Sequence, residues 1–91
     1  MKTLVTDSAR WQLRAATASL CRRDRGRAKA FRDDVAALLN DPERGESQAH
    51  PLADLPDLPF REVRIDEYRL FLRSERGVLW LAGVWETAVE G

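Results

Sequence analysis

The chain has 91 residues and a formal net charge of zero, with 15 basic side chains, 15 acidic side chains and one cysteine. Its length predicts a single domain over residues 1–91. A lone cysteine excludes an internal disulfide, and no apolar run reaches the roughly 18 residues that cross a bilayer. The N-terminal segment MKTLVTDSARWQ lacks the apolar stretch and cleavage site of a signal peptide. We therefore expect a soluble, cytoplasmic protein.

Charge is distributed unevenly along this neutral chain. Residues 10–32 contain eight basic side chains against Asp24, whereas residues 33–59 contain seven acids against Arg44. Zero net charge argues against a general nucleic-acid-binding protein, but a basic segment still produces a local positive field. The simpler alternative is that these basic side chains lie hydrated on helix surfaces and bind no partner.

The first 40 residues carry one strand pattern and two helical patterns. Residues 2–6 are β-prone and predict a first strand, after which Asp7 and Ser8 are suitable N-cap residues. Gly26 permits a break between the helices, and Pro42 ends the second. The apolar residues of the two helices recur every three or four positions: Ala9, Leu13, Ala16 and Leu20, then Ala28, Phe31, Val35, Leu38 and Leu39. The prediction is a helical hairpin with a basic tip at residues 22–27.

The second half begins with a long connection and ends in a sheet. Residues 41–59 contain all four prolines and no periodicity, so we expect no regular structure there, although Leu52, Leu55 and Leu58 should contact the core. From residue 60 the apolar period becomes two, which predicts strands over 60–65, 68–73 and 78–85 with short turns. The third strand is apolar on both faces, as a central strand would be.

These elements predict an α+β fold of order β-α-α-β-β-β, in which the helical hairpin covers a three-stranded antiparallel meander. The expected core joins residues of both helices to residues of the strands: Leu13, Leu20, Phe31, Val35 and Leu38 against Val63, Leu70, Leu72 and Trp80.

Neither Cys21 nor His50 belongs to a recognisable set of ligands or catalytic residues. Cys21 follows the first helical pattern without a histidine near it in the sequence, so we expect a buried or half-buried thiol. His50 has no second histidine or cysteine nearby and is expected to be a solvated loop residue. The sequence also lacks a Gly-rich phosphate loop. We expect neither a metal nor a cofactor.

The strand arginines are the remaining signal. Arg69 and Arg73 flank Phe71 on one face of a strand, which suits RNA because guanidinium groups neutralise phosphate and stack on unpaired bases. The same pattern suits a solvated sheet face with Arg/Glu pairs, so the residues alone leave both interpretations open.

A second surface is expected on the last strand. Leu79, Leu81 and Trp85 add more apolar area than one helical layer covers, so we expect them to bind a protein partner.

The order of the expected elements, together with the stretch of residues 60–85, resembles the RelE/ParE family of bacterial toxins from type II toxin–antitoxin pairs, and the resemblance covers most of the chain. The residues that carry the resemblance are Arg61-Glu62-Val63-Arg64, Tyr68-Arg69-Leu70 and Gly83-Val84-Trp85, and residues 38–42 resemble the end of the second family helix. The resemblance implies a toxin that a cognate antitoxin inhibits, with roles in growth inhibition and plasmid stabilisation. It also implies one of two targets, messenger RNA on the ribosome or DNA gyrase.

The same resemblance implies roles for individual residues. Arg69 matches the arginine after the family tyrosine, and Arg61 or Arg64 falls near the basic residues of the preceding strand, so these three are the implied catalytic residues. Glu86 is a weaker match. The chain departs from the ribonuclease pattern after Trp85, where no lysine, histidine or tyrosine follows to protonate the leaving 5′-oxygen.

Three interpretations therefore stay open: a toxin acting on translation or gyrase, a non-catalytic protein-binding member of the same scaffold, and an unrelated α+β domain.

Overall fold

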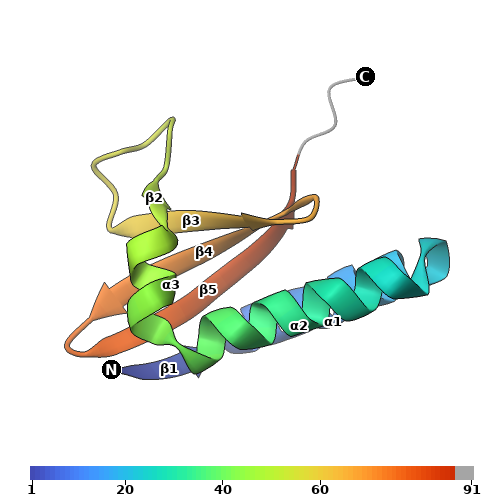
Figure 1. The fold of residues 1–91 in the computed structure, drawn as a ribbon. Coiled ribbons are helices and arrows are strands. Elements are labelled where there is room, and N and C mark those ends of the chain that lie inside the picture. The colour runs from blue at the N-terminus through green and yellow to red at the C-terminus, as the bar shows by residue number, and fades with distance from the viewer. Residues whose placement is uncertain (88–91) are drawn as a thin grey trace.

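The computed structural model describes residues 1–87, which form a five-stranded sheet with two long helices on one face (Figure 1). The elements are β1 (Lys2–Val5), α1 (Asp7–Arg23), α2 (Arg25–Asn40), α3 (Pro42–Gln48), β2 (His50–Pro51), β3 (Phe60–Ile65), β4 (Tyr68–Glu75) and β5 (Val78–Glu86). The predicted α+β class and the helical hairpin followed by the meander are confirmed. No helix among the described residues is long and apolar enough to cross a membrane.

The sheet is mixed, with the strand order β1-β5-β4-β3-β2. β1 pairs with β5 in parallel, and the other neighbours are antiparallel. Two-residue turns join the last three strands, at residues 66–67 and 76–77. The first turn is as predicted, whereas the second is shorter than the predicted 74–77 because β4 continues to Glu75. Arg76 and Gly77 both have positive φ, of 51° and 76°, which is the backbone that a tight hairpin turn requires. β5 thus lies inside the sheet between β1 and β4, as its two apolar faces indicate.

The helix ends differ from the prediction by a few residues. Thr6, and not Asp7 or Ser8, is the N-cap of α1, because its hydroxyl accepts the backbone N–H of Ala9 at 3.1 Å. The break between the helices falls at Asp24, whose carboxylate accepts the N–H groups of Gly26 and Arg27. Gly26 itself lies inside the first turn of α2. Asp24 is therefore both the C-cap of α1, through its backbone N–H, and the N-cap of α2, through its carboxylate.

The expectation of no regular structure over residues 41–59 is wrong for its first part. Asp41 caps α3 by accepting the N–H of Arg44, and Pro42 occupies the first turn, where its missing N–H is no loss. Gly45 is buried against α2, where an added Cβ would lie 2.9 Å from Cδ1 of Leu38. The loop after β2 lies at the β2 edge of the sheet, distant from α1 and α2 (Figure 1). Leu52 is buried there as expected, but Leu55 and Leu58 are exposed.

The core lies between the helical hairpin and the sheet. Leu20, Phe31, Val35, Leu38, Leu70 and Leu72 are buried as predicted, and Leu13 and Val63 pack partly buried against them. Trp80 is not part of this core, because the side chains of β5 that face the helices are those of Leu79 and Leu81. A β-bulge further along β5 changes which alternate residues face the helices. Phe71 pairs with Gly83 while Leu72 pairs with Leu81, which leaves Ala82 as an extra residue.

Ion pairs tie the tip of the helical hairpin to the β3–β4 turn. Arg23 bonds Glu67, and Arg27 bonds Asp66 through its Nε at 3.1 Å and through Nη2. The hydrogen bond from Arg27 lowers the pKa of Asp66, and the bond from Arg23 likewise lowers the pKa of Glu67. Two arginines of the basic segment are therefore used to fix the helices on the sheet.

Candidate functional site

The sheet face opposite α1 and α2, called the open face below, gathers most of the predicted site residues. In an antiparallel sheet, paired residues project to the same side, and alternate residues along a strand share a face. The registers Phe60↔Arg73, Glu62↔Phe71 and Arg64↔Arg69 therefore place three residues of β3 and three of β4 together. β5 adds Trp80, Gly83 and Trp85 to the same face, through the registers Arg73↔Trp80, Phe71↔Gly83 and Arg69↔Trp85.

Arg69 is held at the centre of the open face by Glu62. Its Nε donates to Oε2 of Glu62 at 2.6 Å, and its guanidinium carbon lies 5.1 Å from the centre of the Phe71 ring. Glu62 is only 9% exposed, and it also lies 3.9 Å from Nε of Arg64. The carboxylate neutralises Arg69 and holds its guanidinium over the ring of Phe71.

A shallow apolar hollow of about 290 Å³ lies beside this ion pair. Arg73 stacks on Phe60 at one edge, 5.8 Å from the ring centre. The Trp85 indole lies over Gly83 at the bottom of the hollow, since a Cβ added to Gly83 would lie 2.9 Å from Nε1 of Trp85. Trp85 is 59% exposed. The lining residues are Leu52, Phe60, Phe71, Ala82, Gly83 and Trp85. The hollow can receive a flat apolar group while the arginines at its edge contact an anionic group.

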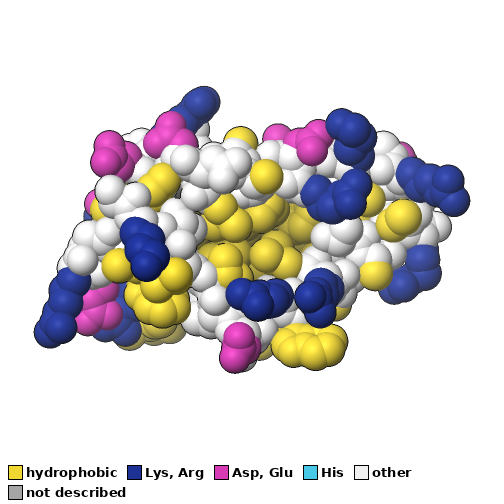
Figure 2. All heavy atoms as spheres, turned by 90° about the horizontal axis from the view of Figure 1, so that it is seen from below, with side chains coloured by type: hydrophobic (Ala, Val, Ile, Leu, Met, Phe, Trp, Pro, Cys, Tyr) yellow, Lys and Arg dark blue, Asp and Glu magenta, His cyan; other side chains and the backbone are white. Residues whose placement is uncertain are grey.

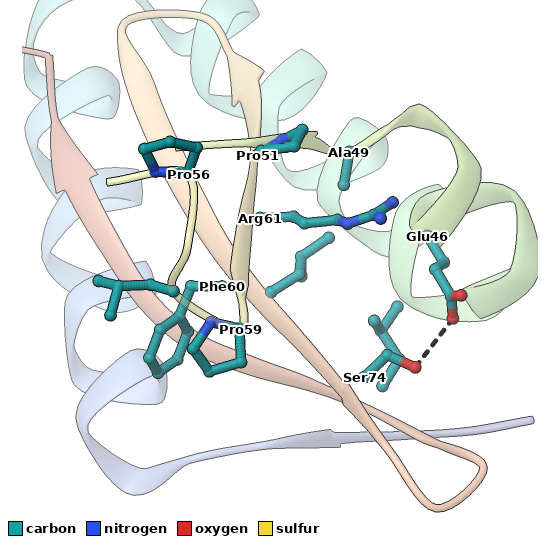
Figure 3. Close-up of a pocket in the computed structure, with 11 residues that line it drawn as sticks. Glu46, Ala49, Pro51, Pro56, Pro59, Phe60, Arg61 and Ser74 are labelled. Carbon is teal, nitrogen blue, oxygen red and sulfur yellow. Dashed lines mark hydrogen bonds between the residues drawn. The ribbon is translucent and has the colours of Figure 1, made fainter. Parts of the chain in front are cut away.

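Arg61 does not belong to this site. Strand alternation turns it to the helix side of β3, where it lies in a separate pocket of about 380 Å³ below the proline-containing loop (Figure 3). In that pocket Glu46 of α3 accepts a hydrogen bond from Ser74 at 2.9 Å. The three arginines implied as catalytic residues are thus divided by the sheet, with Arg64 and Arg69 on one side and Arg61 on the other.

Three further residues of the predicted sites lie away from the open face. Leu79 and Leu81 are 1% and 0% exposed, because they face the helical hairpin, so they cannot form a partner surface in this fold. Only Trp85 of that predicted set is exposed. Glu86 pairs with Tyr68, whose buried side chain faces the helices, so this register turns Glu86 away from Arg69.

His50 is the open-face residue that sequence reasoning missed. It lies in β2 and pairs with Glu62, which places its exposed imidazole on the same face as Arg69 and Phe71. The two residues of β2 are too few to give a period, so no sequence pattern predicts this strand. Cys21 also differs from expectation, because its thiol is exposed. Among residues 1–87, no group of three or more His, Cys, Asp and Glu side chains could hold a metal ion.

Comparisons with known proteins give one kind of match. No family model matches the chain, and no curated protein matches it in sequence. Among solved structures, the fold is similar to a chain of the structure described as the chromosomal ParDE TA system from P. aeruginosa. The TM-score is 0.71, the sequence identity is 12%, and the match covers 97% of each chain. The likeness therefore extends over the whole fold.

Proposed function

We propose that this chain is the toxin component of a bacterial toxin–antitoxin pair, that a cognate antitoxin protein inhibits it, and that it acts in the cytoplasm on translation or on DNA gyrase. The observation that carries the proposal is the match in fold, over 97% of both chains, to a chain of a ParDE TA system. The strand motifs around Arg64, Arg69 and Trp85 add support, because all three residues lie on the one open face.

The open face is the proposed target-binding surface. It presents Arg64, Arg69 and Arg73 around an aromatic hollow. Carboxylates neutralise the positive charge of these arginines only in part, since the shortest contact of Arg73 to Glu75 is 3.7 Å. A target with a planar group and a neighbouring phosphate or carboxylate fits this arrangement. Binding is favoured over cleavage, because Glu62 already engages the one arginine that matches the family tyrosine-arginine pair.

One observation favours ribonuclease action as a second candidate function. Register places His50 beside Glu62 on the open face, so an imidazole lies on the same face as Arg69 although no histidine follows Trp85. A histidine is suited to protonate a leaving oxygen near neutral pH.

Two assays on the purified protein test the proposal and separate its branches. The first follows a cell-free bacterial translation reaction with the transcripts mapped for cuts, and the second follows supercoiling by DNA gyrase. We expect inhibition in one assay that Arg69→Ala weakens and that Arg44→Ala, a control on α3, leaves unchanged. Transcript cuts that vanish in His50→Ala would assign the ribonuclease branch. Full activity of both systems at saturating protein would contradict the proposed function.

A further inference from the structure

The pocket that contains Arg61, called the Arg61 pocket below, lies on the helix side of the sheet and takes no part in the proposed function. It has a volume of about 380 Å³ and lies between α3, the loop after β2 and the sheet (Figure 3). The registers Arg61↔Leu72 and Ser74↔Leu79 place Arg61 and Ser74 on the same side as two buried leucines. Polar side chains of the sheet therefore reach a space that is otherwise lined by apolar groups.

Arg61 and Glu46 bring opposite charges into this pocket without neutralising each other. Within residues 1–87 neither side chain forms an ion pair, either with the other or with a third group. Glu46 accepts a hydrogen bond from the Ser74 hydroxyl through Oε2, at 2.9 Å, so its Oε1 is available to a further donor (Figure 3). Two opposite charges held apart in one pocket fit a ligand that carries both charges itself.

The loop supplies an apolar surface beside these charges. Pro51, Pro56 and Pro59 line the pocket together with Leu58. Leu58 is 44% exposed, so a ligand in the pocket would remove apolar surface from water. The proline rings fix the φ angles of this loop, which reduces the entropy that is lost when a ligand orders it.

Arg61 differs in its surroundings from the basic residues of the helices. Viewed from the side of α1 and α2, Lys and Arg side chains lie around the edges of the surface that faces water (Figure 2). Two of the helix arginines, Arg23 and Arg27, are already paired with the β3–β4 turn. Arg61 instead comes from the sheet and lines a concave pocket, where a guanidinium can bind a small anion together with the group attached to it.

We propose that the Arg61 pocket binds a free α-amino acid with a large apolar side chain, such as leucine. The α-carboxylate bonds the Arg61 guanidinium through both oxygens, which is the favoured geometry for this pair. The α-ammonium donates to Oε1 of Glu46 and to the Ser74 hydroxyl, and the apolar side chain packs on Leu58 and the prolines. A longer peptide fits less well, because amide bonds remove one or both of the two adjacent charges. This inference does not depend on the proposed function, since the open face is on the other side of the sheet.

Titration of isotope-labelled protein with L-leucine, followed through the backbone amide resonances, tests the proposal. We expect saturable shifts at Ala49 and Ser74, which line the pocket, and none at Gly83 on the open face. L-Leucinamide lacks the carboxylate and N-acetyl-L-leucine lacks the ammonium group. Each should bind about tenfold or more weakly than leucine, because one charge-assisted contact is lost. Equal affinity of either analogue and leucine would overturn the proposal.

Two substitutions in the pocket and two on α3 make the result specific. Arg61→Ala and Glu46→Gln should each raise the Kd for leucine about tenfold or more, and the glutamine still accepts the hydrogen bond of Ser74. Arg44→Ala and Glu43→Gln, which remove the same kinds of charge outside the pocket, should change the Kd by less than about twofold.

The amide spectrum of each variant also shows whether that variant is folded. If a pocket variant does not fold, the comparison of leucine with its two analogues on the wild-type protein decides the matter. Three results would overturn the proposal: no saturable shift of the wild-type protein up to the solubility limit of leucine, shifts confined to the open face, or an unchanged Kd in folded Arg61→Ala and Glu46→Gln proteins.

Discussion

Glu62 and Arg69, which face each other diagonally across β3 and β4, form a hydrogen-bonded ion pair with the Arg69 Nε 2.6 Å from the Glu62 carboxylate. The pair is half-shielded from water and lies against the Phe71 ring. A target anion that binds Arg69 must therefore share the guanidinium with Glu62 or displace it. Glu62 consequently controls both the geometry and the charge of the open face.

Glu62→Gln separates these two effects. The neutral amide keeps the shape but loses a charge-assisted hydrogen bond, so the free energy of unfolding in urea should fall by about 1–3 kcal/mol. Affinity of the open face for an anionic target should rise at the same time, because Arg69 loses its counter-charge. Glu75→Gln is the control, since Glu75 is exposed and its contact to Arg73 is 3.7 Å, and it should change stability by less than about 0.5 kcal/mol. Equal effects of the two substitutions would contradict the central role of Glu62.

The core between helices and sheet makes a direct stability prediction. Phe31 and Leu70 are 1% and 0% exposed, so truncation of either to alanine should cost about 2–5 kcal/mol. Such a loss approaches the whole stability of a small domain. Trp11→Ala, a larger change at an exposed position, should cost much less. Unchanged thermal unfolding of the Phe31 and Leu70 variants would refute this packing.

The ion pairs between the hairpin tip and the β3–β4 turn predict a dependence of stability on pH. Asp66 and Glu67 have pKa values below their ordinary 3.8 and 4.5, because Arg27 and Arg23 bond their charged forms. Groups with a lowered pKa stabilise the fold at pH values above the unfolded pKa, and this contribution is lost as pH falls through the folded pKa. The Tm should thus decline from about pH 4.5 downward, and high salt should reduce the effect because the pairs are exposed.

Asp66→Asn/Glu67→Gln should flatten this part of the Tm profile. Asp33→Asn, which removes the surface pair with Lys29, is the matched control and should leave the slope near that of the wild type. An unaltered slope in the double variant would assign the acid sensitivity to other carboxylates.

Gly83 tests the hollow of the open face. A methyl group at this position would lie 2.9 Å from Nε1 of Trp85, so Gly83→Ala must displace the indole. We expect a shifted indole N–H resonance for Trp85 and weaker target binding. In a Trp85→Ala background the same substitution should add little further loss, which a double-mutant cycle would reveal as coupling between the two positions. Additive effects would place the Trp85 ring elsewhere.

The sequence predicts the local elements of this fold well because its periods are clear. β3 and the turn at residues 66–67 follow from the alternation after residue 60, and the two helical sets identify α1 and α2. α3 is not predicted by periodicity, because its seven residues carry no amphipathic period. Asp41 followed by Pro42 is nevertheless a recognisable helix start. The pairing of β1 with β5 joins residues far apart in the chain, which no local pattern encodes.

The candidate site was predictable only where strand alternation decides it. Arg69, Phe71 and Arg73 share a face as expected from a period of two. Leu79 and Leu81 face the helices and not a partner. Alternation alone cannot predict this, because β5 is apolar on both faces. The bulge at Ala82 then shifts the pattern within the strand, and bulges depend on pairing with β4.

Growth after induced expression of the chain, in a bacterial host that lacks the adjacent gene, tests directly whether this chain is a toxin. The wild-type protein should arrest growth, Arg69→Ala should arrest it more weakly, and Arg44→Ala should arrest it undiminished. Expression of the adjacent gene as well should relieve the arrest. Growth at the uninduced rate, with folded wild-type protein present in the cells, would contradict the claim that this chain is a toxin.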